Sequence, residues 1–171
     1  MLYSTVAEVA EIDENTVVLD VCCGTGEFVG MARGAYVGVD LHLPYLQFAH
    51  KRNGGQLGFA CMDGGRLAVG DGAFDKAMII NALHHLDEAT IDRLFVELRR
   101  VVRGTVLVVD ADPDLANPLE GFLLGLDRGD FIRQPEELRK IVSRHYRIER
   151  EERFHNTLHT VPQILFRLTA D

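Results

Sequence analysis

The sequence predicts an α/β fold built on a mostly parallel β-sheet. Two observations lead to this fold class: aliphatic segments alternate with helical segments up to residue 110, and two strand-like segments follow one another near the carboxyl terminus. Alternating strands and helices form parallel sheets, because each right-handed crossover returns the chain to the same edge of the sheet. The last two segments are joined by a short connection, so we expect them to form an antiparallel pair.

The length and composition predict one globular domain. The chain has 171 residues, of which 47% are hydrophobic and 26% are charged, as is usual for a soluble protein. No apolar run approaches the roughly 18 residues of a membrane-spanning helix, and the first residues lack the pattern of a secretory signal. We therefore expect a single cytoplasmic domain over residues 1–171, with no membrane span.

The charge of the chain argues against a protein that acts on nucleic acid, and its cysteine content argues against a zinc or redox protein. The formal net charge is −8 and no long basic cluster occurs, which disfavours a nucleic-acid substrate. The three cysteines, Cys22, Cys23 and Cys61, lack the CxxC spacing of a zinc or redox site. We expect reduced, buried thiols and no metal.

Strands and helices alternate through the first third of the chain. The predicted strands cover residues 17–21, 35–40 and 56–61. Helical spacing of apolar residues predicts helices within the first fifteen residues, at 27–33 and at 45–52.

The rest of the chain adds further strands, three helices and the terminal pair. The strands cover residues 74–80, 105–109, 146–154 and 161–168. The clearest helix begins at the N-cap Asp87, because the apolar residues after it keep a period of 3.6 and Gly104 ends it. Capping signals at Asn117 and Pro135 predict two more helices. The helix at Asn117 either packs into the core or belongs to a small lid insertion at about 113–134.

The segment VVLDVCCGTG, residues 17–26, is the most informative motif. A buried strand ends in a turn where Gly24 and Gly26 let a ligand approach the backbone closely, and a helix start follows. This combination is typical of sites that bind the polar part of a nucleotide-like ligand.

Three acids lie at or just past the carboxyl ends of the first three strands. Asp40 is placed to accept hydrogen bonds from the two hydroxyls of a ribose. Asp63 could accept one from an adenine amine, with Leu41 and Met62 against the ring. Asp20 would repel a phosphate and suits a ligand that carries a positive charge. The alternative for each acid alone is a helix cap or a turn former.

In these segments the sequence resembles the class I S-adenosylmethionine-dependent methyltransferases. VLDVCCGTG is similar to the cofactor loop of that family, GVDLHLPYL to its ribose-binding strand and helix, and CMDGG to its adenine-contacting turn. FDKAMIINALHHL and LFVELRRVVRGTVLVVD are similar to its fourth and fifth strands. The resemblance covers nearly the whole chain and is closest to the type 11 branch, which includes ubiquinone and menaquinone biosynthesis methyltransferases.

The resemblance implies a fold and an activity. The fold is a three-layer sandwich around a seven-stranded sheet in the order 3-2-1-4-5-7-6, with the last strand antiparallel. The activity is methyl transfer from S-adenosyl-L-methionine to a small-molecule acceptor, with S-adenosyl-L-homocysteine as product.

The resemblance also implies a set of cofactor-binding residues, in which the glycine loop passes the methionine part and Asn81 lies near its sulfonium end. The set is Asp20, Cys22, Gly24, Gly26, Asp40, Leu41, Met62, Asp63, Asn81, Leu83 and His84. Asp20 is expected near the amino group of the methionine part. Cys22 stands where the family pattern has its first glycine, and we expect it to be tolerated if its φ angle is negative.

Catalysis in such a site needs no obligatory base. A methyl group on a sulfonium is already activated, so holding the acceptor in line can supply much of the rate. For a hydroxyl or carbon acid, His84 and His85 are the catalytic candidates, because imidazole titrates near neutral pH. Less direct candidates at the pocket are His155, His159, Arg133 and Tyr3.

Two other functions remain open from the sequence. One is a non-catalytic S-adenosylmethionine-binding or scaffold protein that needs a partner, because little of the chain is available to cover a substrate. The other is an NAD-dependent dehydrogenase, but Val29 stands where its glycine motif requires a third glycine and Asp20 suits a pyrophosphate poorly. A monomer and a homodimer are both compatible with the sequence.

Overall fold

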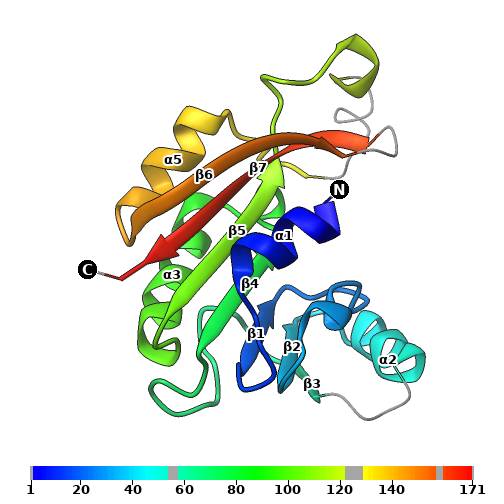
Figure 1. Ribbon diagram of the computed structural model, residues 1–171, viewed down its shortest axis with the longest axis vertical. Coiled ribbons are helices and arrows are strands. Elements are labelled where there is room, and N and C mark those ends of the chain that lie inside the picture. Colours follow the sequence, from blue (N-terminus) through cyan, green and yellow to red (C-terminus); the bar gives the residue numbers. More distant parts are fainter. Residues whose placement is uncertain (1, 54–57, 122–128, 157–159, 171) are drawn as a thin grey trace.

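The computed structural model describes residues 2–53, 58–121, 129–156 and 160–170. Its strands form one seven-stranded sheet in the order β3-β2-β1-β4-β5-β7-β6, in which β7 is antiparallel to both of its neighbours and the other pairs are parallel (Figure 1). The strands are β1 (Val18–Val21), β2 (Tyr36–Asp40), β3 (Gly58–Cys61), β4 (Lys76–Ile80), β5 (Thr105–Ala111), β6 (Arg147–Asn156) and β7 (Thr160–Thr169). The predicted fold class and strand order are confirmed.

Helices cover both faces of this sheet. They are α1 (Leu2–Ala10), α2 (Leu43–Arg52), α3 (Glu88–Val101) and α5 (Pro135–Ser143), with short 3₁₀ turns η1 (Val29–Met31) and η2 (Leu83–His85). Alternate residues of a strand point to opposite faces, and in β1 Leu19 packs in the cluster with α3 and α5, whereas Val18 packs in the cluster with α1. Among the described residues, no helix combines the length and hydropathy needed to span a membrane.

The helix at Asp87 forms as predicted. Oδ1 of Asp87 accepts a hydrogen bond of 2.7 Å from the backbone N–H of Thr90, which satisfies one of the free donors at the helix start. The apolar stripe of this helix, α3, includes Ile91 and Phe95 and is fully buried against the sheet. The helix is therefore capped at its start and anchored on the sheet along its apolar stripe.

Most elements differ from their predicted extent by one or two residues at an end, and the predicted helix at 27–33 differs most. The predicted helix at 27–33 is only the turn η1, because Gly30 and Gly34 weaken so short a segment and Ala32 is already extended. Strand β5 continues past 109 to Ala111, because β7 pairs with it up to Gln163. The predicted capping box at Asn117 is present, with its side chain accepting hydrogen bonds from the next turn, but the helix beyond residue 121 lies outside the described residues.

Candidate functional site

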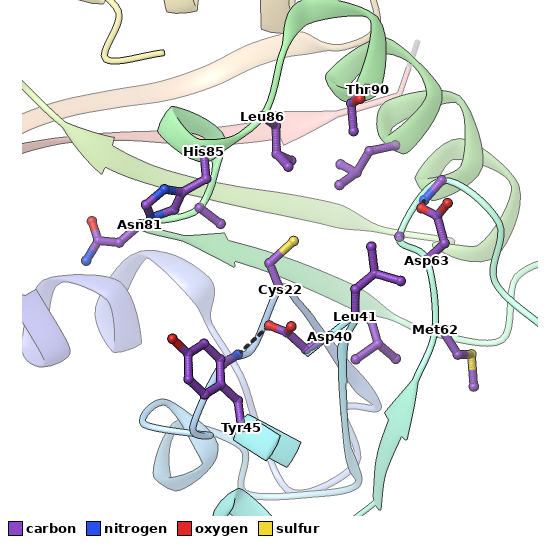
Figure 2. Close-up of a pocket in the computed structure, with 16 residues that line it drawn as sticks. Cys22, Asp40, Leu41, Tyr45, Met62, Asp63, Asn81, His85, Leu86 and Thr90 are labelled. Carbon is purple, nitrogen blue, oxygen red and sulfur yellow. Dashed lines mark hydrogen bonds between the residues drawn. The ribbon is translucent and has the colours of Figure 1, made fainter. Parts of the chain in front are cut away.

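A cavity of about 350 Å³ lies where β1, β2, β3 and β4 end at one edge of the sheet (Figure 2). Parallel strands bring loops that are distant in the sequence together at this edge. Seven of the predicted cofactor-binding residues line the cavity, namely Cys22, Gly24, Asp40, Leu41, Met62, Asp63 and Asn81.

The loop after β1 turns sharply because several of its residues have left-handed backbone. Gly24 and Gly26 have φ angles of 52° and 69°, a region that glycine enters without steric cost. A Cβ at Gly26 would also lie only 3.0 Å from the ring of Phe59, so a side chain here would require that ring to shift. Gly26 does not line the cavity itself; it lets the loop pack on the sheet.

Cys22 departs from the expectation of a negative φ angle. Its φ is 59°, which for a non-glycine residue costs roughly 1–2 kcal/mol. The side chain points into the cavity (Figure 2), and burial, with Asp40 nearby, raises the pKa of its thiol to about 12. Cys22 is therefore a neutral thiol in a strained position on the cavity wall.

Asp40 joins the glycine loop to the end of β2. Its Oδ2 accepts a hydrogen bond of 2.9 Å from the backbone N–H of Gly24, and its Oδ1 accepts one of 2.8 Å from that of His42. Each carboxylate oxygen has two lone pairs, so each can accept one further hydrogen bond from a ligand in the cavity.

Asp63 plays a similar part after β3. Its Oδ1 accepts a hydrogen bond of 2.9 Å from the backbone N–H of Gly65 in a tight turn. Among the described residues, no lysine or arginine lines the cavity, so Asp40 and Asp63 make it acidic. No group of three or more potential metal ligands occurs in the described part of the chain.

An apolar part of the cavity lies beside Asp63. Leu41 and Met62 line it from the strand ends, while Leu86 and Thr90 face it from η2 and α3 (Figure 2). Leu41 is 68% exposed, which leaves its surface available to a ligand.

Asn81 follows β4 and has a φ angle of 52°. Asparagine is among the few non-glycine residues that adopt this region readily. Its backbone N–H donates a 2.8 Å hydrogen bond to the carbonyl of Val109, which ties the strand end to β5. The side chain lines the cavity near His85 (Figure 2).

Three other predicted residues, Asp20, Leu83 and His84, do not line the cavity. Asp20 is 1% exposed and accepts a 2.7 Å hydrogen bond from the hydroxyl of Tyr36, and burial raises its pKa to about 7. Leu83 is buried in the core, and Nδ1 of His84 is hydrogen-bonded at 2.5 Å to the buried carboxylate of Asp110. Of the two catalytic candidates, the structure brings only His85 to the cavity.

The geometry of a 3₁₀ turn explains this division. Side chains three residues apart lie on the same side of such a turn, so Ala82 and His85 share the cavity side; Leu86 is extended and does not follow this pattern. Leu83 and His84 then point into the protein.

The less direct candidates have other contacts. The guanidinium of Arg133 donates to the carbonyls of Leu83 and Leu86, outside the cavity. Tyr3 packs near Gly30, and His155 is exposed beside Glu120. His159 lies outside the described residues.

Several lining residues were not identified from the sequence. They are Val39, Tyr45, Gly64, Gly65, Ala82, Leu86, Thr90 and Leu94. Tyr45 lies in the first turn of α2, four residues after Leu41, and this closeness in the sequence could have suggested it. Thr90 and Leu94 are also four residues apart, but the helical pattern of α3 alone indicated only core packing.

Comparisons with known proteins agree with this geometry. Residues 18–105, just over half of the chain, match the family model described as a methyltransferase domain. A search of curated protein sequences returns no match.

Three solved structures illustrate how widely the fold is shared. An Aquifex aeolicus SAM-dependent methyltransferase is 16% identical with a TM-score of 0.76, and the alignment covers 99% of this chain and 89% of that one. The magnesium protoporphyrin IX methyltransferase of Synechocystis PCC 6803, solved with bound SAH, is 16% identical with a TM-score of 0.73, covering 99% and 80%. The (4+2)-cyclase SpnF is 20% identical with a TM-score of 0.77, covering 99% and 80%.

The strand order, the cavity at the strand ends and the family match lead to one assignment. The chain belongs to the methyltransferase domain family and is a class I S-adenosylmethionine-dependent methyltransferase.

Proposed function

We propose that the cavity binds S-adenosylmethionine and that the protein transfers its methyl group to a small-molecule acceptor. The observation that carries this proposal is the combination of an acidic and an apolar part in one cavity. S-adenosylmethionine has a sulfonium cation, a ribose diol and an aromatic base. The two carboxylates suit the ribose hydroxyls and the amine of the base, their negative charge favours a cationic ligand, and the apolar part suits the ring of the base.

The residues at the strand ends would hold the adenosine part. Asp40 would accept hydrogen bonds from the ribose hydroxyls through the lone pairs that Gly24 and His42 leave available. Asp63 would accept one from the adenine amine. Leu41 and Met62 would lie against one side of the ring, with the η2 and α3 side opposite them.

The glycine loop and the end of β4 would hold the methionine part. Cys22, Gly24 and Asn81 line that region. The other predicted cofactor-binding residues do not line the cavity, so their contribution would be to fix the surrounding loops. They are Asp20, Gly26, Leu83 and His84.

When bound, the cofactor supplies a methyl group activated by its positively charged sulfur. The chain's part is to orient the acceptor, to exclude water and to take a proton where the acceptor carries one. We assign this last role to His85, the only histidine among the described lining residues.

The segment after β5 is the candidate to cover the acceptor. We propose that residues 1–171 form one domain and that the segment at about 113–134 lies over the acceptor. Its described parts follow β5 past the sheet edge (Figure 1), and they carry the exposed side chains of Leu119 and Phe131. The net charge of −8 favours a small acceptor over a nucleic acid. We also propose that the protein is a cytoplasmic monomer or homodimer.

Isothermal titration calorimetry with S-adenosylmethionine and S-adenosylhomocysteine tests the cofactor. We expect dissociation constants in the range of about 1 μM to 1 mM, as for ordinary enzyme ligands. Absence of heat with both ligands, for a protein that is folded by circular dichroism, would refute the proposal.

Methyl transfer needs a separate experiment. The protein is incubated with S-adenosylmethionine labelled in its methyl group and with panels of small molecules. Each panel carries one kind of acceptor: a hydroxyl group, a carboxylate, an amine, a thiol or an acidic carbon. Labelled product from one panel identifies the acceptor class. Cofactor binding with no transfer, alone and with copurifying proteins, would instead favour a non-catalytic binding protein.

A further inference from the structure

The turn η2 forms one wall of the cavity but has little stability of its own. In the segment 82–86, which comprises η2 and one flanking residue on each side, Ala82, His85 and Leu86 line the cavity. Within the segment, only two backbone hydrogen bonds occur among the described residues, from His85 to Ala82 and from Leu86 to Leu83. Such short 3₁₀ turns have poor hydrogen-bond geometry, so contacts from elsewhere must hold this one.

One set of contacts comes from the sheet. The carboxylate of Asp110, near the end of β5, is bonded through Oδ1 to Nδ1 of His84 at 2.5 Å and through Oδ2 to the backbone N–H of His84 at 3.0 Å. The two side chains are 5% and 7% exposed. Buried polar groups need partners, so separating this pair would leave a carboxylate uncompensated in the protein interior.

A second set of contacts comes from residues 131–133. The Arg133 guanidinium donates to the carbonyl of Leu83 at 2.8 Å and to that of Leu86 at 2.6 Å. The backbone N–H of Phe131 donates to the carbonyl of His84 at 3.0 Å. Three carbonyls of the turn therefore have partners far away in the sequence.

His84 packs closely against the backbone of Gly129. A Cβ at Gly129 would collide with Cδ2 of the His84 ring and would lie 3.0 Å from its carbonyl oxygen. The ring also contacts His85, with centroids 4.1 Å apart. The buried imidazole thus links the sheet to the side chain that faces the cavity.

From these contacts we propose that His84, Asp110 and Arg133 are positioning residues for the cofactor site. They hold η2 so that Ala82, His85 and Leu86 face the cavity, and they act without touching the ligand. This inference rests on the proposed function for its consequence in binding, but the restraint itself is a property of the free protein.

Two pairs of variants test it by calorimetry with S-adenosylhomocysteine. His84→Ala and Arg133→Ala each lose hydrogen bonds to the turn, and we expect the dissociation constant to rise about tenfold, the usual consequence of losing such a bond. His84→Asn keeps an N–H near the position of Nδ1, and Arg133→Lys keeps a cationic donor, so both should recover at least about half of the loss on a logarithmic scale. Arg139→Ala is the matched control, because this α5 arginine pairs with Glu151 away from the cavity.

Hydrogen–deuterium exchange of the free proteins separates this inference from the proposed function. Amides of residues 82–86 should exchange at least about tenfold faster in the alanine variants than in the wild type and Arg139→Ala. Faster exchange with no ligand binding by the wild type would refute the proposed function alone. Unchanged exchange and a dissociation constant within about twofold of the wild type would refute the positioning role. If an alanine variant does not fold, His84→Asn or Arg133→Lys replaces it in the same experiments. We then expect exchange rates and dissociation constants between those of the wild type and those expected for the alanine variant. Exchange rates and dissociation constants equal to those of the wild type would contradict the positioning role.

Discussion

On one side of the cavity, β1, β2 and β3 end in loops whose functional side chains are within a few residues of the strand. On the other side, Leu86 reaches the cavity from just after η2, and Thr90 and Leu94 reach it from α3. The first side depends on local turns, such as the bond between Asp63 and Gly65. The second depends on packing and on hydrogen bonds from distant segments. The comparison suggests that substitutions on the first side weaken binding, whereas those on the second also weaken the fold.

Leu94→Ala should have the largest effect and tests the second side. Leu94 is 2% exposed and lines the cavity while packing in the core. Its truncation should lower the free energy of unfolding by about 2–5 kcal/mol, as is usual for buried leucine. Urea denaturation measures this loss. Val96→Ala on the exposed face of α3 is the control, and a change of similar size there would contradict the argument.

The pH dependence of stability tests the buried Asp20 on the first side. Burial raises its pKa from 3.8 to about 7, so between these values the folded state holds a proton that the unfolded state releases. Its contribution to stability is full below about pH 4 and is lost as the pH rises to 7, by on the order of 3 kcal/mol.

Asp20→Asn should remove this part of the slope, since the amide cannot ionise and still accepts the Tyr36 hydroxyl. Urea denaturation at several pH values, compared between the two proteins, measures the difference. Parallel curves from pH 4 to 7 would show that Asp20 ionises normally.

Asp40→Ala should affect binding more than stability. The substitution removes the carboxylate that would accept hydrogen bonds from the ligand and that accepts one from the N–H of Gly24. We expect the binding of S-adenosylhomocysteine to weaken by about 1.5–3 kcal/mol. Calorimetry measures this change. Asp71→Ala is the control, because the Asp71 side chain is 81% exposed and lies outside the cavity. Equal affinities for the two variants would rule out the ribose assignment.

The two non-glycine residues with left-handed backbone that line the cavity should respond differently to glycine, with the smallest effects. Cys22→Gly should raise the free energy of unfolding by about 0.5–1 kcal/mol, because the strain at φ 59° exceeds the entropy cost of glycine. Asn81→Gly should be neutral within about 0.5 kcal/mol, because asparagine already suits φ 52°. Thermal denaturation compares them. Destabilisation by Cys22→Gly would mean that packing of the thiol outweighs the strain.

The sequence predicts those site residues whose position depends only on the strand that directly precedes them. Asp40, Asp63 and Gly24 follow strands whose apolar runs are evident, and the edge of a parallel sheet gathers whatever follows those strands. The orientation of His84 and His85 could not be predicted this way. Whether an adjacent pair points inward or outward depends on Asp110 and Arg133, which are distant in the sequence.

The sequence by itself determined the α/β class, the alternation of elements and the acidic rim with its glycine loop, because these follow from local periodicity and from the backbone freedom of glycine. Only the tertiary structure decided that Cys22 has left-handed backbone, that Asp20 is buried and that α3 completes the cavity. These features depend on how the loops and helices pack on the sheet, and contacts between distant segments determine that packing.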